Sequence, residues 1–188
     1  SNYNQMAARR FYYSDSISAF LNRSVNEIIG ELTLASQHDI NDETSSSWVE
    51  EIDTLKEALA PFSGHGSVYF EYNIPRMGRR ADVVAVIDGI VFVLEYKTAE
   101  QKFHRDAMVQ VWDYALDLKN FQEGSHDRVL VPVLVAPKEK VKHCSLELKH
   151  FEDNVYEPLM VNAHLLGAGI SKVLDSIPHE VQLKTADD

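Results

Sequence analysis

Two acidic residues and a lysine lie at the ends of two neighbouring apolar segments of the sequence. Asp82 stands near the start of one segment, and Glu95 and Lys97 close the other, with twelve residues between the two acids. Carboxylate oxygens are ligands that Mg²⁺ and Mn²⁺ prefer. A divalent ion held there would polarise a phosphoryl oxygen and lower the pKa of a water, while a nearby lysine could orient that water or offset negative charge. This combination indicates metal-dependent hydrolysis of phosphodiester bonds.

The two segments are predicted to form a β-hairpin that brings the acids together. Residues 81–87 and 90–96 are strongly apolar and rich in β-branched side chains, and the Asp88-Gly89 pair between them is a strong signal for a two-residue turn. Such a turn pairs the two residues that flank it. Continued along the hairpin, the same register places Asp82 opposite Glu95. The two carboxylates could therefore share one metal ion.

The lysine is predicted to lie on the same face as the acids. Side chains along a strand alternate between its two faces, so Lys97 shares the face of Glu95 and Tyr96 points to the other. The alternative is that these charges are ordinary solvated strand ends. Charges that flank such apolar strands in matched register are uncommon by accident, which favours a site.

The rest of the chain is predicted to alternate between helices and strands. Apolar residues three and four apart predict helices, alternating ones predict strands, and polar stretches with Pro or Gly predict turns. The expected helices are one or two within 14–37, one carrying Trp48, Ile52, Leu55 and Leu59 and ending near Pro61, one over 104–120, and a short one over 170–177. The expected strands are 68–74, 81–87, 90–96, 128–136 and a further one within 150–165. Residues 38–47 are expected to form a loop, with Ser46 or Ser47 capping the next helix.

This order of elements predicts the fold class. Between residues 47 and 136 it runs helix, strand, strand, strand, helix, strand, which is typical of an α/β fold with a mixed sheet between helices. A length of 188 residues fits one domain, 1–188. We therefore expect 10–37 to be an N-terminal helical extension of the core and 138–188 to be a C-terminal extension.

Composition and missing motifs exclude several classes of protein. The net charge of −11 argues against coating nucleic acid by bulk electrostatics, so any such contact must be local. The single cysteine, Cys144, cannot form an intramolecular disulfide, which favours a reducing, cytoplasmic location. No apolar run is long enough to cross a membrane. GxxxxGK[S/T], HExxH and GxSxG motifs are absent, so ATP hydrolysis, zinc proteolysis and serine esterase chemistry are not expected.

The pattern formed by Asp82, Glu95 and Lys97 also resembles the motif of a known family. Asp82, twelve intervening residues and Glu95-Tyr96-Lys97, preceded by Gly78-Arg79-Arg80, resemble the motif of the PD-(D/E)XK nuclease superfamily, with Ala81 where the motif has proline. On the next predicted helix, Gln110 and Tyr114 lie one turn apart and are similar to the QxxxY motif of RecB-like members. The predicted order of elements matches the superfamily's restriction-endonuclease-like core over about half of the chain.

The resemblance implies roles for particular residues. Asp82 and Glu95 would bind Mg²⁺ or Mn²⁺, the Tyr96 carbonyl would complete the metal shell, and Lys97 would assist the attacking water. Gln110 and Tyr114 would support the site. A glutamate from the first core helix often joins it, and of Glu50, Glu51 and Glu57 we favour Glu51. Basic residues that could bind phosphates are Arg76, Arg79, Arg80, Lys102, His104 and Arg105.

The resemblance extends to the partners of such a domain. Residues 72–82 and 112–121 are similar to the N-terminal nuclease-like region of bacterial helicase-like proteins, which would make this chain part of a longer protein with a fused or partner ATPase. DNA is favoured over RNA as substrate, and defence or repair as the setting. Two alternatives remain open. The fold could bind nucleic acid or a partner without catalysis, or it could act as a homodimerisation module, which would present a large exposed apolar patch.

Overall fold

The computed structural model describes residues 9–37, 42–97, 105–136, 147–152 and 154–177, without the side chains of 42–46. Its strands are β1 (Tyr13–Ser16), β2 (Gly66–Ile74), β3 (Arg79–Ile87), β4 (Ile90–Tyr96), β5 (Leu130–Ala136), β6 (His150–Glu152), β7 (Val155–Tyr156) and β8 (Leu159–Asn162). Its helices are α2 (Ile17–Asn22), α3 (Val25–Ala35), α4 (Asp42–Leu59), α5 (Arg105–Phe121) and α6 (Leu166–Ser176), with 3₁₀ turns η1 (Ala60–Phe62) and η2 (Glu123–Ser125).

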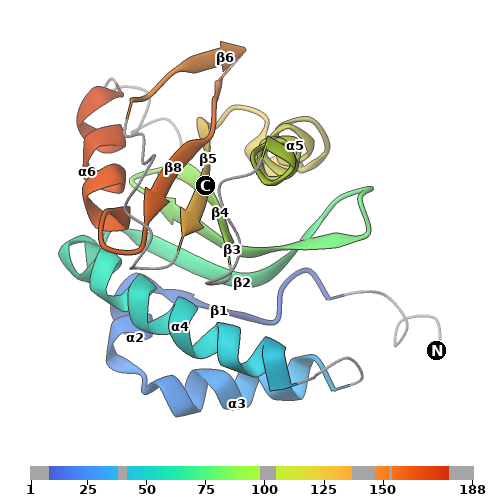
Figure 1. The fold of residues 1–188 in the computed structure, drawn as a ribbon, viewed down its shortest axis with the longest axis vertical. Coiled ribbons are helices and arrows are strands. Elements are labelled where there is room, and N and C mark those ends of the chain that lie inside the picture. Colours follow the sequence, from blue (N-terminus) through green and yellow to red (C-terminus); the bar gives the residue numbers. More distant parts are fainter. Residues whose placement is uncertain (1–8, 38–41, 98–104, 137–146, 153, 178–188) are drawn as a thin grey trace.

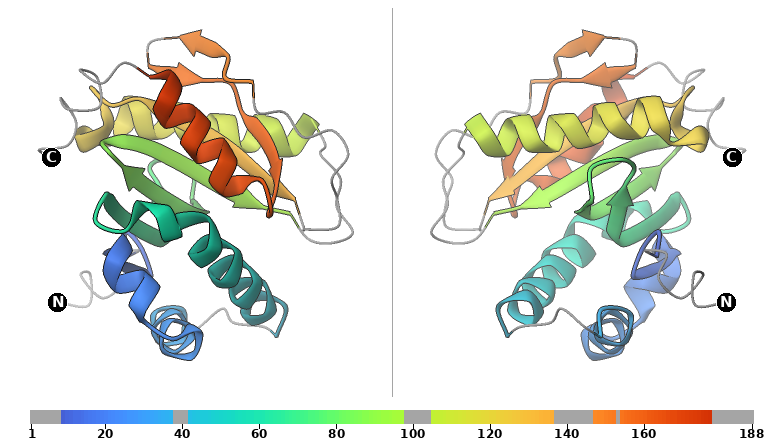
Figure 2. Two further views of the ribbon diagram at one scale, coloured as in Figure 1. Left: turned by 90° about the vertical axis from the view of Figure 1, so that its left-hand side faces the viewer. Right: turned by 90° about the vertical axis from the view of Figure 1, so that its right-hand side faces the viewer.

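The eight strands form one mixed sheet between helices, as the sequence predicts. The strand order is β1-β2-β3-β4-β5-β7-β6, and β8 also pairs with β5. β1 to β4 are antiparallel neighbours, whereas β5 runs parallel to β4, β7 and β8. Helix α5 covers one face of the sheet, and α4 and α6 lie on the other (Figures 1 and 2). The fold is therefore α/β with helices on both faces.

Two hydrophobic clusters fill the space on either side of the sheet. The larger cluster joins buried residues of α2, α3, α4 and α6, such as Phe20, Ile52 and Ile170, to strand residues such as Phe92. The smaller cluster lies under α5. β1 and β8 add strands from the two extensions to the sheet, so the N- and C-terminal parts share one core with the central hairpin.

The N-terminal region differs from the prediction in one respect. Two helices are present as expected, but Ser14 to Ser16 belong to strand β1, which pairs with β2. The prediction of helix from Ser14 is wrong because Ser16 accepts a hydrogen bond from the Ala19 N–H and so caps α2. A second N-cap at Ser24, in a capping box with Glu27, begins α3.

Helix α4 begins earlier than the sequence predicts. It starts at Asp42, so the expected loop over 38–47 is wrong from residue 42 onward, and neither Ser46 nor Ser47 is its cap; residues 38–41 lie outside the described residues. Packing of the apolar face around Trp48 anchors the helix, which outweighs the weak helix propensity of Ser and Thr near its start. The helix ends at Leu59, before Pro61, as predicted.

The C-terminal part holds more structure than the sequence predicts. Three short strands, β6 to β8, occupy the region where one was expected, and α6 begins at Leu166 rather than near residue 170. Strand β7 pairs with β5 only at Leu130, and β8 pairs with residues 133–136 of β5. Within the described residues, none of the helices has the length and apolar character that crossing a membrane requires.

Candidate active site

The central hairpin has the register that the sequence predicts. Asp88 and Gly89 have φ of 49° and 82°, the left-handed conformation that a tight two-residue hairpin turn requires. The ladder between β3 and β4 begins with Ile87 opposite Ile90 and continues to Val83 opposite Leu94. The next position along both strands therefore places Asp82 opposite Glu95.

At that position the two acidic side chains replace part of the backbone ladder. The Asp82 N–H donates a hydrogen bond of 2.8 Å to Glu95 Oε1, and the Tyr96 N–H donates one of 2.8 Å to Asp82 Oδ2. Each carboxylate is thereby held against the opposite strand. Both still have a second oxygen that these two bonds do not use, so the pair can accept further ligands.

The ladder between β2 and β3 is interrupted beside Asp82. Phe70 pairs with Val83 and Tyr72 pairs with Ala81, but Glu71 between them has a φ of 55°. Phe70 and Val83 pack into the larger cluster, whereas Tyr72 and Ala81 pack into the smaller one. Both strands thus change the face that they bury at this point, and Asp82 lies at the change.

Glu71 is a site residue that the sequence analysis missed. Its Oε1 accepts a hydrogen bond of 3.1 Å from Trp48 Nε1, which turns the carboxylate toward α4. Burial raises the pKa of Glu71, and its charge in turn raises the pKa of Asp82. The alternation of Val68, Phe70, Tyr72 and Ile74 assigns Glu71 to the polar face of a regular strand, and a positive φ leaves no signal in a non-glycine sequence.

Glu51 on α4 is the buried one of the three glutamates considered for this helix. Its side chain is 4% exposed, and its Oε2 has no hydrogen-bond partner in the structure. Glu50 and Glu57 are exposed. The charge of Asp82 raises the pKa of Glu51, after the larger effect of burial, so Glu51 belongs to the same electrostatic group as the hairpin acids.

The four carboxylates repel one another in a site where Glu51 and Glu95 are buried and Asp82 and Glu71 are half-buried. Burial, followed by the charge of Glu71, raises the pKa of Asp82 to about 7. Burial, followed by the charge of Asp82, raises the pKa of Glu95 well above its usual value. Such a group is stabilised either by taking up protons or by a cation.

Lys97 lies just beyond the end of β4, where its backbone N–H donates to the Val135 carbonyl at 2.8 Å. Its positive charge acts to lower the pKa of Asp82 and of Glu95, against the stronger effect of burial. The Tyr96 side chain packs instead against the larger cluster. The Lys97 charge thus acts on the two hairpin acids, while the Tyr96 ring lies near Glu51 and Asp82, whose charges raise its pKa after the larger effect of burial.

Helix α5 contributes the predicted tyrosine. Tyr114 is 2% exposed, and its pKa is raised first by burial and then by the charge of Glu95, which places it beside that carboxylate. The nearby Arg79 acts in the opposite direction and lowers the pKa of Tyr114. Gln110 is half-buried one turn earlier on the same helix.

Of the six predicted phosphate-binding residues, three are exposed, one is held by the fold and two lie outside the described residues. Arg76 and Arg79 are exposed on the tip of the β2–β3 hairpin, and Arg76 stacks on the Phe121 ring at 4.3 Å. Arg80 is committed to the fold, because its guanidinium donates to the Glu71 and Arg9 carbonyls, both at 2.7 Å, and stacks on Tyr12. Arg105 is exposed at the start of α5. Lys102 and His104 lie outside the described residues.

The carboxylate oxygens suit a hard divalent cation, although they do not converge on one point. Among the described residues, no three His, Cys, Asp or Glu side chains converge at metal-binding spacing. Asp82 and Glu95 each have an oxygen tied to a backbone N–H, while Glu51 presents an unpartnered buried oxygen. Carboxylate oxygens of this kind are the ligands that Mg²⁺ and Mn²⁺ prefer, so the residues fit such an ion.

Comparison of the chain with the models of known protein families finds no match, and neither does comparison with curated protein sequences. The function of the chain is therefore inferred from the residues of the site and their geometry.

Proposed function

We propose that the chain is a Mg²⁺- or Mn²⁺-dependent nuclease with a restriction-endonuclease-like core. The observation that carries this proposal is the pairing of Asp82 with Glu95 at the end of the hairpin, each bound to the backbone of the opposite strand. Burial raises the pKa of Glu51, whose Oε2 has no hydrogen-bond partner, and Glu51 lies close enough for the charges of both acids to raise it further. Buried acids that repel one another are costly without a function. They are useful where a cation must bind.

Each residue has a role that follows from its position. Asp82, Glu95 and Glu51 would hold the ion, with the Tyr96 carbonyl as a further oxygen ligand. The ion would polarise a phosphoryl oxygen and lower the pKa of a water. Lys97, whose charge acts on Asp82 and Glu95, would orient that water and offset charge on the phosphate. Tyr114 would keep the Glu95 carboxylate in position from α5, with Gln110 beside it.

A second candidate is a nuclease-like fold that binds nucleic acid without cutting it. The observation that favours it is the commitment of Asp82 and Glu95 oxygens to backbone N–H groups instead of a common point. The two candidates differ in what metal addition does, since only the nuclease requires the carboxylates to engage an ion.

The first test is cleavage of labelled single- and double-stranded DNA and RNA in Mg²⁺, Mn²⁺ or EDTA. We expect metal-dependent cutting that falls by about 10²–10⁴-fold in Lys97→Met, the range typical of a lost proton-transfer or water-orienting group. Asp82→Asn should lose at least as much. Asp175→Asn and Lys172→Met, exposed on α6, are the matched controls and should cut like the parent chain.

Metal binding supplies an independent readout. Calorimetric titration with Mn²⁺ should show binding weakened by about tenfold or more in Glu51→Gln. Glu50→Gln, the exposed neighbour on α4, should bind like the parent. The nuclease proposal is wrong if no substrate is cut with either metal and metal binding is the same in Asp82→Asn as in the parent chain. Nucleic-acid binding without cutting would then support the second candidate.

A further inference from the structure

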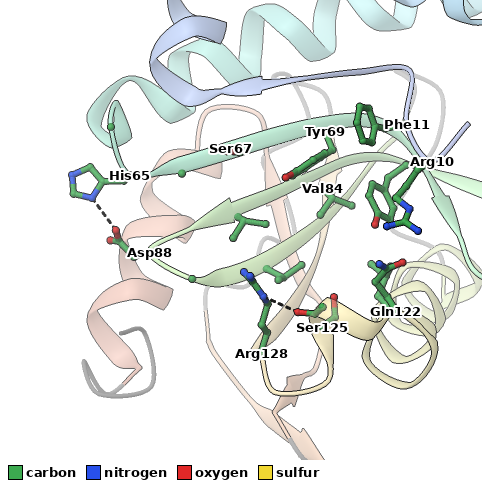
Figure 3. Close-up of a pocket in the computed structure, with 18 residues that line it drawn as sticks. Arg10, Phe11, His65, Ser67, Tyr69, Val84, Asp88, Gln122, Ser125 and Arg128 are labelled. Carbon is green, nitrogen blue, oxygen red and sulfur yellow. Dashed lines mark hydrogen bonds and ion pairs between the residues drawn. The ribbon is translucent and has the colours of Figure 1, made fainter. Parts of the chain in front are cut away.

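A groove runs along the α5 face of the sheet, and its lining does not include the four site carboxylates themselves. Its volume is about 710 Å³, within the roughly 300–1,000 Å³ typical of ligand pockets. Val84, Val86 and Val91 form its floor on β3 and β4, and the end of α5 with the η2 turn forms one wall. Figure 3 shows the groove open between this wall and the strands.

The opposite wall is aromatic. Phe11 and Tyr69 meet edge to face with ring centroids 5.4 Å apart, and Tyr69 meets Tyr72 in the same way at 5.9 Å. Phe11 and Tyr69 are partly exposed, so their rings are not fully used by the core. Rings that line an open groove offer stacking surfaces for flat apolar groups.

Arginines lie on both sides of the groove. Arg10 is exposed beside Phe11, and its charge acts on Tyr72. Arg128, 8% exposed, donates from Nε to the Gly124 carbonyl at 2.8 Å, which fixes the guanidinium against the η2 wall (Figure 3). Two cations beside aromatic rings suit a ligand that is both flat and anionic.

The groove adjoins the proposed active site. Val84 on its floor is two residues from Asp82 along β3, and Tyr72 on its wall pairs with Ala81, the residue before Asp82. A ligand in the groove would therefore reach the carboxylates by continuing along β3.

We propose that this groove binds unstacked bases of single-stranded nucleic acid, with Arg10 facing its phosphates and Arg128 as a fixed positive charge in the wall. The placement of the strand beside the cleaved bond rests on the proposed nuclease function, but the binding itself does not. A duplex hides its base faces in the stack, whereas a single strand exposes them to aromatic side chains. The net charge of −11 also disfavours binding that depends on phosphate attraction alone.

The test is binding of a short fluorescein-labelled oligothymidylate to the full chain in EDTA, followed by anisotropy, so that no cleavage is involved. Tyr69→Leu keeps an apolar side chain but removes the stacking face, and should weaken binding about tenfold. Arg10→Gln should also weaken binding, and it should reduce the slope of log affinity against log salt concentration by about one. Phe151→Leu, at an aromatic residue 44% exposed outside the groove, and Lys172→Gln are the matched controls.

Further arms define the ligand. Oligouridylate tests RNA against DNA, and a hairpin duplex should bind more weakly than either single strand. Thermal melts by circular dichroism show that each variant is folded. Unchanged binding in both Tyr69→Leu and Arg10→Gln would refute the proposal that the groove binds nucleic acid, even if the parent chain cuts. Equal binding of the duplex would refute the preference for single strands. Groove-dependent binding by a chain that cuts nothing would support the groove and refute the nuclease.

Discussion

At the scale of residues, the site is defined by four neighbouring acids that are buried or half-buried. Ionised carboxylates are costly to bury, and four of them near one another are costlier still. Their raised pKa values record that cost. The site is therefore a source of instability that protons or a divalent cation would relieve.

This instability predicts how the metal-free protein responds to pH. The pKa of Asp82 is raised to about 7 in the folded chain, against about 4 when unfolded, so the folded state holds a proton that the unfolded state releases in this window. Stability must then fall as pH rises from about 4 to about 7. In EDTA, we expect the melting temperature to drop by about 3 °C or more between pH 5 and pH 8.

The variant Asp82→Asn should show a shallower decrease, because it has no proton to lose at that position. Asp175→Asn, exposed on α6, is the matched control and should follow the parent chain. Melting curves recorded by circular dichroism across this pH range make the comparison. Parallel slopes for the parent and Asp82→Asn would show that Asp82 titrates normally.

At the scale of elements, the pairing of β2 with β3 positions the site. Gly66 begins β2 opposite Ile87, and a Cβ at this position would overlap the Val86 carbonyl. The close approach of the two strands therefore requires glycine here. Because β3 carries Asp82, disturbing this pairing affects the strand that holds the site.

Gly66→Ala is accordingly expected to destabilise the protein by about 2–3 kcal/mol, since the added methyl forces the strands apart. Gly30→Ala is the control: Gly30 is exposed on α3 with open space around its Cβ position, so alanine should be neutral or stabilising by up to about 1 kcal/mol. Urea unfolding followed by tryptophan fluorescence measures both. Equal stability of the two variants would contradict the close strand contact.

At the scale of the whole molecule, the two extensions are part of the same core as the hairpin. Phe20 and Ile28 from the N-terminal helices, and Leu159 and Ile170 from the C-terminal part, are buried in the larger cluster with the central strands. Without them, only α4 would cover that face of β2 to β5. The central segment predicted from the sequence is therefore not expected to be a self-sufficient folding unit.

A chain limited to residues 47–136 should consequently fail to unfold cooperatively, whereas the full chain should melt in a cooperative transition. The reason is the loss of apolar burial on one face of the sheet, worth about 25 cal/mol for each Å² exposed. Near-ultraviolet circular dichroism and calorimetry distinguish the two cases. A sharp, heat-absorbing transition in the 47–136 chain would refute this view of the core.

Much of the central fold was predictable because its signals are local. Strands β2 to β5 and helix α5 begin and end within two residues of their predicted limits. Asp88-Gly89 specifies a tight turn, and the two-residue period of strands then carries the register to Asp82 and Glu95. Regular periodicity likewise places Tyr114 on the buried face of α5.

The amino-acid sequence by itself thus determined the hairpin, its register and the acidic pair at its end, because turn chemistry and strand alternation act between neighbours in the chain. Only the tertiary structure decided that Glu71 interrupts the β2–β3 ladder beside Asp82 and that Glu51 is buried while Glu50 is exposed. It also decided that the extensions complete the sheet. Those features depend on packing between segments far apart in the chain, and local propensities do not encode it.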